Sequence, residues 1–432
     1  MKLRNIKWKG IFCLFLLNVI LSCGGGSNGG SGSGGRGLSS NGGIDYDDSP
    51  FGAHGQNQDY QTISDIGIEW SRLSGTEGLS WELVDNDNTG NYAWSTLDNK
   101  INSAKENNIN LFITITSLNQ KDAETCRSPD HEPDEFGMSY DRKMPCDLKK
   151  YKQFIKAAVN RYGVDLIYQV ENEIADGHFW KDTPQNYALL LKETYLAVKE
   201  NCPDCFVAIG SATKPNFWSD PDISVNPEYF EDIFKELKTY PECADNGCHD
   251  IFDLHGLIYH PDELSKGLNL TKEAFDNLKA LQQAYSFDRP IWSTEAGFLS
   301  EDVEWNKKII AQTYVKGLEM GIEKLFWRVT EECCEIIDKI DSQKTGTYYA
   351  YNILIEKIKG YFGITKLSES QYKIEFSDKN PAYLLWCHSG SCEAPSEITG
   401  TVLVTDYLGS ETTVNAYQME LTESPVFVEA VQ

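Results

Sequence analysis

Between about residue 50 and residue 360, short apolar segments alternate with longer segments that carry apolar residues three and four positions apart. The short runs are typical of buried strands, and the longer spacing is typical of amphipathic helices. The predicted strands are Phe51–Gly55, Ile66–Leu73, Ile109–Thr116, Asp165–Glu173, Cys205–Ser211, Ile251–Tyr259, Pro290–Phe298 and Lys324–Thr330. The predicted helices are Thr96–Glu106, Leu148–Arg161, Pro184–Glu200, Thr271–Tyr285, Trp305–Met320 and Tyr348–Ile358.

Eight strands separated by helices predict parallel βαβ units that close into a (β/α)8 TIM barrel, which we place at residues 45–360. A doubly wound open sheet is the structural competitor, but the chain lacks its glycine-rich loop after the first strand. After residue 361 the pattern changes to short strands without long helices. We therefore expect residues 361–432 to form a small antiparallel, β-sandwich-like module. Its predicted strands are Tyr372–Phe376, Tyr383–Cys387, Thr401–Tyr407 and Val426–Glu429.

The N-terminal segment predicts a targeting signal. Four of the first nine residues are basic, and an apolar run follows from Ile11 to Leu21, which together indicate a signal peptide over residues 1–22. The dipeptide Ser22-Cys23 resembles the end of the lipobox of bacterial lipoproteins, which implies a lipid on Cys23. The Gly/Ser-rich residues 23–44 would then be a flexible tether. We expect a protein anchored to the membrane of the bacterial cell envelope; an ordinary secretory leader is the alternative.

Ten cysteines remain besides Cys13 and Cys23, and an even number in an exported protein indicates disulfides. Close neighbours along the chain give the expected pairs, which are Cys126–Cys146, Cys202–Cys205, Cys243–Cys248 and Cys387–Cys392. The spacing of Cys202 and Cys205 also suits zinc, but no second pair of this spacing or nearby histidine pair accompanies it. We expect neither a metal nor a cofactor.

Charge narrows the choice of partners. The chain carries a formal charge of −26, so it repels phosphate backbones, and nucleic acid is excluded as a partner. Polyanionic glycans are disfavoured for the same reason.

We expect the protein to be a monomer.

Two glutamates stand at the ends of predicted strands. Active sites of (β/α)8 barrels form where the strands end, and Glu173 and Glu295 occupy that position on the fourth and seventh strands. Cleavage of a glycosidic bond requires two carboxyl groups, one to protonate the departing oxygen and one to attack or to activate water. Glu171 is the alternative to Glu173 on the same strand.

The segments Asn172-Glu173 and Thr294-Glu295-Ala296-Gly297 resemble the catalytic motifs of clan A glycoside hydrolases, the cellulase, xylanase and β-xylosidase type of barrel. The resemblance implies that Glu173 is the acid/base, Glu295 the nucleophile, and Asn172 a ligand of the neighbouring sugar hydroxyl. It also implies substrate-site roles for Arg72, His255, Tyr259 and Trp327, with Arg72 beside the nucleophile and Trp327 as the floor of the reacting sugar's subsite. His54, at the end of the first strand, is a further candidate.

The resemblance implies a retaining hydrolase that acts on β-linked or stereochemically equivalent bonds of oligo- or polysaccharides. Retention requires the two carboxyl groups to lie about 5 to 5.5 Å apart. Because Glu173 must begin the reaction protonated, we expect the site to raise its pKa. A transglycosylase of the same fold and a non-catalytic glycan-binding lipoprotein are the alternative functions.

Overall fold

The structure is a computed structural model of the 432-residue chain, and it describes residues 49–133, 138–175, 177, 179–213, 227–257, 264–297, 303–329, 335–338 and 343–431. The predicted signal peptide and tether, with Cys23, and the candidate Tyr259 lie outside the described residues. In the described part of the chain, no helix combines the length and the apolar composition that crossing a membrane requires.

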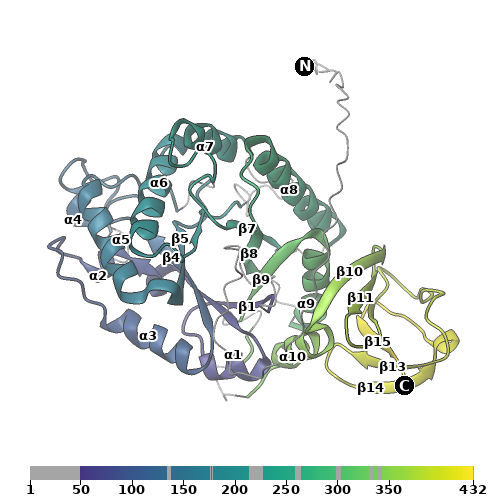
Figure 1. The fold of residues 1–432 in the computed structure, drawn as a ribbon. Helices are drawn as coiled ribbons and strands as arrows, with labels where there is room; N and C mark the ends of the chain where they lie inside the picture. The colour runs from purple at the N-terminus through teal and green to yellow at the C-terminus, as the bar shows by residue number, and fades with distance from the viewer. Residues whose placement is uncertain are drawn as a thin grey trace, which may run out of the picture. The chain divides into compact units, whose positions relative to one another are not determined.

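Eight parallel strands form a closed ring, which Figure 1 shows surrounded by helices. Hydrogen-bonded neighbours follow the order β6-β5-β4-β2-β1-β9-β8-β7, and the parallel bridges Ala208–Ile251 and Ala212–Leu254 join the two ends. The predicted TIM barrel is therefore confirmed. The strands are β1 (Phe51–His54), β2 (Trp70–Leu73), β4 (Asn110–Thr116), β5 (Leu166–Val170), β6 (Val207–Ala208), β7 (Phe252–Leu257), β8 (Ile291–Ala296) and β9 (Ile322–Arg328); a short β3 (Leu79–Ser80) pairs with β4.

Helices follow most strands, and the predicted ones are all present. They are α3 (Ser95–Glu106), α5 (Leu148–Tyr162), α6 (Pro184–Asn201), α8 (Leu264–Tyr285), α9 (Val303–Met320) and α10 (Gly346–Ile358). The sequence analysis missed α1 (Tyr60–Ile66), α2 (Trp81–Val84), α4 (Gln120–Ala123) and α7 (Pro227–Thr239). The helix α1 takes up the start of the predicted second strand, because Gly67 ends it in the left-handed conformation, with φ +95°.

Side chains alternate between two environments along the strands. Phe51 and Trp327 face outward and belong to the core between the sheet and the helices, where Phe51 packs on Tyr314 of α9. Phe112, Trp292 and Phe326 pack on one another with ring centroids 5.9 to 6.3 Å apart. These three rings come from β4, β8 and β9 and fill the inside of the barrel, so the barrel is closed below the polar side chains at its carboxyl end.

The C-terminal residues form the predicted antiparallel module, a six-stranded sheet. Its strands run in the order β10 (Tyr361–Ser368), β11 (Gln371–Phe376), β12 (Ala382–Leu385), β15 (Val426–Ala430), β13 (Thr401–Asp406) and β14 (Glu411–Asn415). The sequence analysis missed β10 and β14, which are the two edge strands and carry mostly exposed or half-buried side chains. Lys357 of α10 binds Glu429 of β15 at 2.7 Å, and Lys316 of α9 lies 5.0 Å from the Trp386 ring.

Disulfides join all four predicted cysteine pairs. The bridge from Cys126 to Cys146 closes a loop after β4, with its Cα atoms 5.9 Å apart. In the same loop the Asp122 carboxylate accepts the backbone N–H groups of Cys146 and Asp147. The two contacts fix the end of this loop against the start of α5.

Candidate active site

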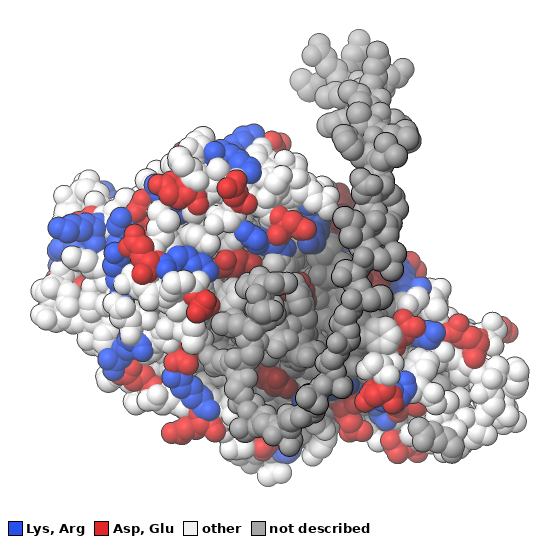
Figure 2. Space-filling view, in the orientation of Figure 1, with Lys and Arg blue, Asp and Glu red and all other residues white. Residues whose placement is uncertain are grey.

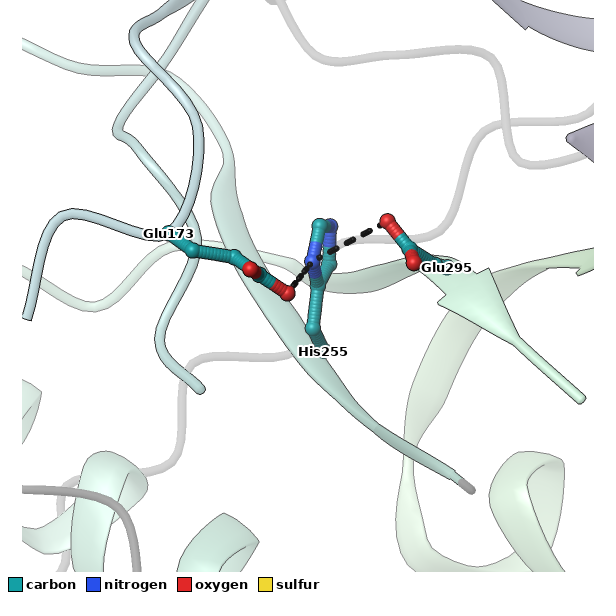
Figure 3. Close-up of side chains that lie close together, drawn as sticks. All are labelled: Glu173, His255 and Glu295. Atoms are coloured by element: carbon teal, nitrogen blue, oxygen red, sulfur yellow. Dashed lines mark hydrogen bonds and ion pairs between the residues drawn. The ribbon is translucent and has the colours of Figure 1, made fainter. Parts of the chain in front are cut away.

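The two predicted catalytic glutamates meet at the carboxyl end of the barrel. Glu295 is the fifth residue of β8, and Glu173 follows the end of β5 by three positions. One carboxylate oxygen from each glutamate and one ring nitrogen of His255 all lie within 4.8 Å of one another. Figure 3 shows the two carboxylates on opposite sides of the His255 ring. The sequence analysis therefore found two groups that the fold brings together from positions 122 residues apart, since 295 minus 173 is 122.

Arg72 fixes Glu295 from the inside of the barrel. Its side chain is 0% exposed, and Nη1 donates to Glu295 Oε2 at 3.0 Å. Nη2 lies within hydrogen-bonding distance of three further oxygens, those of Thr114, Gln169 and Asn172. Burial lowers the pKa of Arg72 to about 10, which still leaves the guanidinium charged at neutral pH. Its charge stabilises the ionised form of Glu295.

A second arginine, Arg328, contacts the other oxygen of Glu295, and the sequence analysis missed it. Arg328 ends β9, and its Nη2 binds Glu295 Oε1. It is paired in register with His54 of β1. The signal that could have found it is strand alternation, because Arg328 lies two residues after the inward-facing Phe326. Both faces of a barrel strand are buried, so hydrophobicity alone does not reveal which residues face inward.

His255 stands between the two glutamates. Its Nδ1 donates to Glu173 Oε1 at 3.0 Å and lies 3.5 Å from Glu295 Oε2. Its Nε2 faces the hydroxyl oxygens of Ser211 and Thr294, and both hydroxyl groups donate their protons to the Asp253 carboxylate. Nε2 therefore faces hydroxyl oxygens whose own protons are donated to Asp253.

The pKa of Glu173 differs from the expectation. Burial raises the pKa of Glu173, but the hydrogen bond from His255 and the charges of His255, Arg72 and Arg328 outweigh it and lower the pKa below its usual value. The expected increase is therefore wrong for the free protein. The physical reason is His255, which the sequence analysis placed in the site without assigning it to either glutamate.

A buried polar layer beneath the glutamates connects these groups. The Gln169 amide accepts from Arg72 through Oε1 and donates to Asp253 through Nε2. Burial raises the pKa of Asp253, but the charge and hydrogen bond of His255 lower it overall. Gln169, Asp253, Ser211, Thr114 and Thr294 were not predicted as site residues. Ser211 follows β6, and the other four lie inside strands, where an isolated polar residue gives no distinctive signal.

Glu171, the alternative acid, has a structural role. Its side chain is fully buried, and Oε1 accepts the backbone N–H of Ser117 at 2.7 Å as well as the Ser117 hydroxyl. Its backbone φ of +62° ends the regular alternation of β5. Burial raises the pKa of Glu171. Glu171 thus holds the end of β4, while Glu173 lies against His255 and Glu295.

The remaining predicted site residues divide into two groups. Asn172 accepts from Arg72 at 2.6 Å, and His54 Nε2 lies 3.6 Å from Glu295 Oε2, so both belong to the cluster. Burial, followed by the charges of Arg72, Arg328 and His255, lowers the pKa of His54 well below its usual value. His54 is therefore neutral at physiological pH.

Trp327 does not form the floor of the site. It is 0% exposed and packs in the core between the barrel and the helices, because it lies on the opposite side of β9 from Arg328. Because adjacent side chains of a strand point to opposite faces, Trp327 cannot face the site when Arg328 does. Trp180, which follows β5, is also buried, and its ring centroid lies 5.7 Å from that of Tyr187.

Replacing Trp327 by phenylalanine is expected to lower the free energy of unfolding by about 1 to 3 kcal/mol and to leave the KM for substrate unchanged. The Nε1 atom of Trp327 has no hydrogen-bond partner among the described residues, so the change removes packing alone. Denaturant unfolding and steady-state kinetics on the same preparation measure both quantities. A large rise in KM without loss of stability would instead indicate a sugar-stacking role.

Glu173, His255 and Glu295 are also the one group of potential metal ligands among the described residues. The positively charged side chains around these three residues disfavour the binding of a metal cation. Arg72 and Arg328 each contact Glu295, and a divalent ion would have to displace one of these guanidinium groups or lie beside it. The cluster is better suited to binding a neutral or anionic molecule.

Comparisons with known proteins bear on the fold. No protein-family model matches the chain, and no curated protein matches its sequence. Solved structures do match. A family 39 glycoside hydrolase from Bacteroides cellulosilyticus WH2 superimposes with a TM-score of 0.64 at 16% identity, over 88% of this chain and 80% of the other.

Two further matches are similar in extent. A family 30 endoxylanase from Clostridium papyrosolvens C71 gives a TM-score of 0.56 at 15% identity, over 88% of this chain and 95% of the other. A family 39 β-xylosidase from Caulobacter crescentus gives 0.57 at 13% identity, over 85% and 90%. All are clan A proteins, so the resemblance inferred from the sequence is confirmed at the level of the fold.

Proposed function

We propose that this protein is a retaining glycoside hydrolase that cleaves β-linked or stereochemically equivalent glycosidic bonds, with Glu295 as nucleophile and Glu173 as acid/base. The observation that carries the proposal is the convergence of the two carboxylates, whose oxygens lie within 4.8 Å. Retaining enzymes hold their carboxyl groups about 5 to 5.5 Å apart, whereas inverting enzymes need about 6.5 to 9.5 Å to admit a water molecule.

The surroundings of the two glutamates support different roles. Arg72 and Arg328 each bind one carboxylate oxygen of Glu295. These two positive charges suit a nucleophile that must attack as an anion. Glu173 is hydrogen-bonded to His255, whose imidazole ring is itself able to bind and release a proton. This contact suits a residue that must gain and lose a proton in each catalytic cycle. The solved structures that match the fold include proteins described as a β-xylosidase and an endoxylanase, and this supports a carbohydrate substrate.

Hydrolysis of an aryl β-glycoside followed by ¹H NMR tests the proposal. The first-formed sugar is expected to be the β-anomer, because two successive inversions restore the configuration. An α-anomer as first product would contradict retention. A sugar acceptor in the product instead of water would favour the transglycosylase alternative, and binding of glycans without turnover would favour the glycan-binding alternative.

The cellular location of the protein remains a prediction from the sequence. We propose that a lipid on Cys23 anchors the protein to the bacterial cell envelope, and the four disulfides are consistent with export to an oxidising compartment.

A further inference from the structure

The loop between β4 and α5 is closed by a disulfide. Its first residue is Ser117, and its described residues are 117–133 and 138–147. The bridge from Cys126 to Cys146 joins the first half of this loop to its end. The Asp122 carboxylate also accepts the backbone N–H of Cys146. The end of the loop, which we call the stapled loop, is therefore fixed to residues near its start.

Both ends of the stapled loop contact the buried carboxylate of Glu171. From the start of the loop, the backbone N–H and the hydroxyl of Ser117 both donate to Glu171 Oε1. Near the end of the loop, Arg142 Nη1 lies 4.0 Å from Glu171 Oε2, which has no hydrogen-bond partner among the described residues. Burial raises the pKa of Glu171, and the charge of Arg142 acts in the opposite direction. Arg142 therefore supplies a counter-charge to a carboxylate that is 0% exposed and little screened by solvent.

The conformation of Glu171 directs the chain toward Glu173. The strand β5 ends at Val170, and Glu171 follows with a backbone φ of +62°. This left-handed conformation is unfavourable for a residue with a side chain, so it persists only where surrounding contacts fix it. Glu173 lies two residues further along the chain. The contacts of Glu171 therefore help to determine where the Glu173 carboxylate lies relative to Glu295.

The stapled loop also holds the segment that follows the proposed acid/base. The backbone oxygen of Arg142 accepts the N–H of Lys181 at 2.9 Å, and its guanidinium carbon lies 5.3 Å from the centroid of the Phe179 ring. Asp182 Oδ2 accepts the N–H of Met144 at 3.0 Å. Arg142 thus contacts the chain both before and after the acid/base.

We propose that Arg142 and the disulfide between Cys126 and Cys146 position Glu173, so that protonation of the leaving group depends on the stapled loop. This inference rests on the proposed function and adds to it a positioning residue that acts through Glu171. As Glu295 forms its bond to C1, the bond from C1 to the leaving oxygen breaks, and that oxygen takes the proton of Glu173.

The two glutamates should respond differently when the stapled loop is loosened. Glu295 is held by Arg72 and Arg328, which belong to β2 and β9 and lie outside this loop. Its attack on C1 should therefore survive. Transfer of the proton from Glu173 requires the carboxyl group within hydrogen-bonding distance of the leaving oxygen, so a small displacement should slow this transfer.

Two leaving groups on one sugar separate these effects. The probes are the phenyl and the 2,4-dinitrophenyl β-D-glycosides of whichever of xylose, glucose, galactose and mannose the wild-type protein cleaves fastest. Phenolate is a poor leaving group and needs a proton, whereas 2,4-dinitrophenolate departs without one. In Arg142→Met, kcat/KM for the phenyl glycoside is expected to fall by about 10- to 100-fold, and kcat/KM for the dinitrophenyl glycoside by less than about 3-fold.

Arg161→Met is the matched control for Arg142→Met. The Arg161 guanidinium also lies over an aromatic ring, that of Tyr162 at 5.9 Å, and pairs with the Asp98 carboxylate. Each variant removes one positive charge, and Figure 2 shows acidic and basic side chains interspersed on the described surface of that face. The two changes should therefore alter the long-range field similarly, and Arg161→Met should keep the wild-type ratio of the two rates.

A second pair of variants tests the disulfide. Replacing both Cys126 and Cys146 by serine should cause the same selective loss on the phenyl glycoside. Replacing both Cys387 and Cys392 by serine removes a disulfide of the C-terminal module and should keep the wild-type ratio. If Arg142→Met does not fold, the first of these double variants supplies the measurement.

The ratio of the two rates separates positioning from stability. Loss of stability lowers the active fraction and reduces both rates equally, so it leaves the ratio unchanged. Arg142→Lys keeps the charge that faces Glu171 and should retain most of the wild-type ratio. An unchanged ratio in folded Arg142→Met, or in the folded variant without the disulfide of the stapled loop, would overturn this inference and leave the proposed function intact. A wild-type protein that cleaves none of these glycosides would refute both.

Discussion

Glu295→Ala is expected to abolish hydrolysis of every glycoside that the wild-type protein cleaves, with kcat reduced by at least about 10⁴-fold. The effect should not depend on the leaving group, because without the carboxylate no covalent intermediate forms. Arg72 and Arg328 lose their common partner in this variant, so its fold must be checked by circular dichroism and thermal unfolding. Initial rates with an aryl glycoside and with an oligosaccharide measure the loss.

Two controls sharpen the test of Glu295. Glu295→Gln keeps the shape of the side chain and should be equally inactive. Glu124→Ala removes an exposed glutamate paired with Lys121 and should retain wild-type activity. Added azide can occupy the space left in Glu295→Ala and attack C1 directly, giving a glycosyl azide of inverted configuration. Residual hydrolysis above about 1% of the wild-type rate would show that Glu295 is not the nucleophile.

The barrel was predictable because each of its eight strands is a short apolar run set between helical patterns. The residues at which the strands begin and end were harder to predict. The predicted strand Cys205–Ser211 is reduced to the two residues of β6, because beyond Ala208 the chain pairs with β7 only through the isolated bridge between Ala212 and Leu254. The helix α1 was missed, and only its last residue, Ile66, was placed in the predicted second strand, since seven residues are too few to show a helical period clearly.

The residues that a motif placed at the carboxyl end of the barrel do lie together there, and their catalytic roles stay a proposal, whereas the position that depended on strand register was wrong. Glu173, Glu295, Asn172 and Arg72 were found from their motifs. Trp327 and Arg328 are adjacent in β9, so their side chains point to opposite faces of the sheet. Only the register of β9 determines which of the two faces the site. The network of Gln169 and Asp253 could not be predicted, because single polar residues within apolar strands acquire partners only when the barrel closes.

Glu173→Ala is expected to affect substrates unequally. A natural sugar leaving group needs protonation, so its hydrolysis should slow by about 10²- to 10⁴-fold in kcat/KM. An activated aryl leaving group departs without a proton, so formation of the glycosyl-enzyme on Glu295 should be nearly unaffected and the intermediate should accumulate. Rapid-mixing kinetics should show a burst of the phenol. Added azide should then restore turnover and give a glycosyl azide of retained configuration.

The pH dependence of the same variant supplies the second half of the prediction. In the wild-type protein the acid must be protonated, and His255, Arg72 and Arg328 together lower the pKa of Glu173. Its protonated form is therefore favoured only at acidic pH, and kcat/KM for a sugar leaving group should fall as the pH rises from an acidic optimum. Glu173→Ala should lose this alkaline decline with an aryl substrate. Glu171→Gln, the neighbouring control, should keep the decline even where it lowers stability, because Glu171 contacts Ser117 and lies outside the reacting cluster. A Glu173→Ala protein that cleaves both leaving groups at the wild-type rate would assign the acid to another residue, and Glu171 would be tested next.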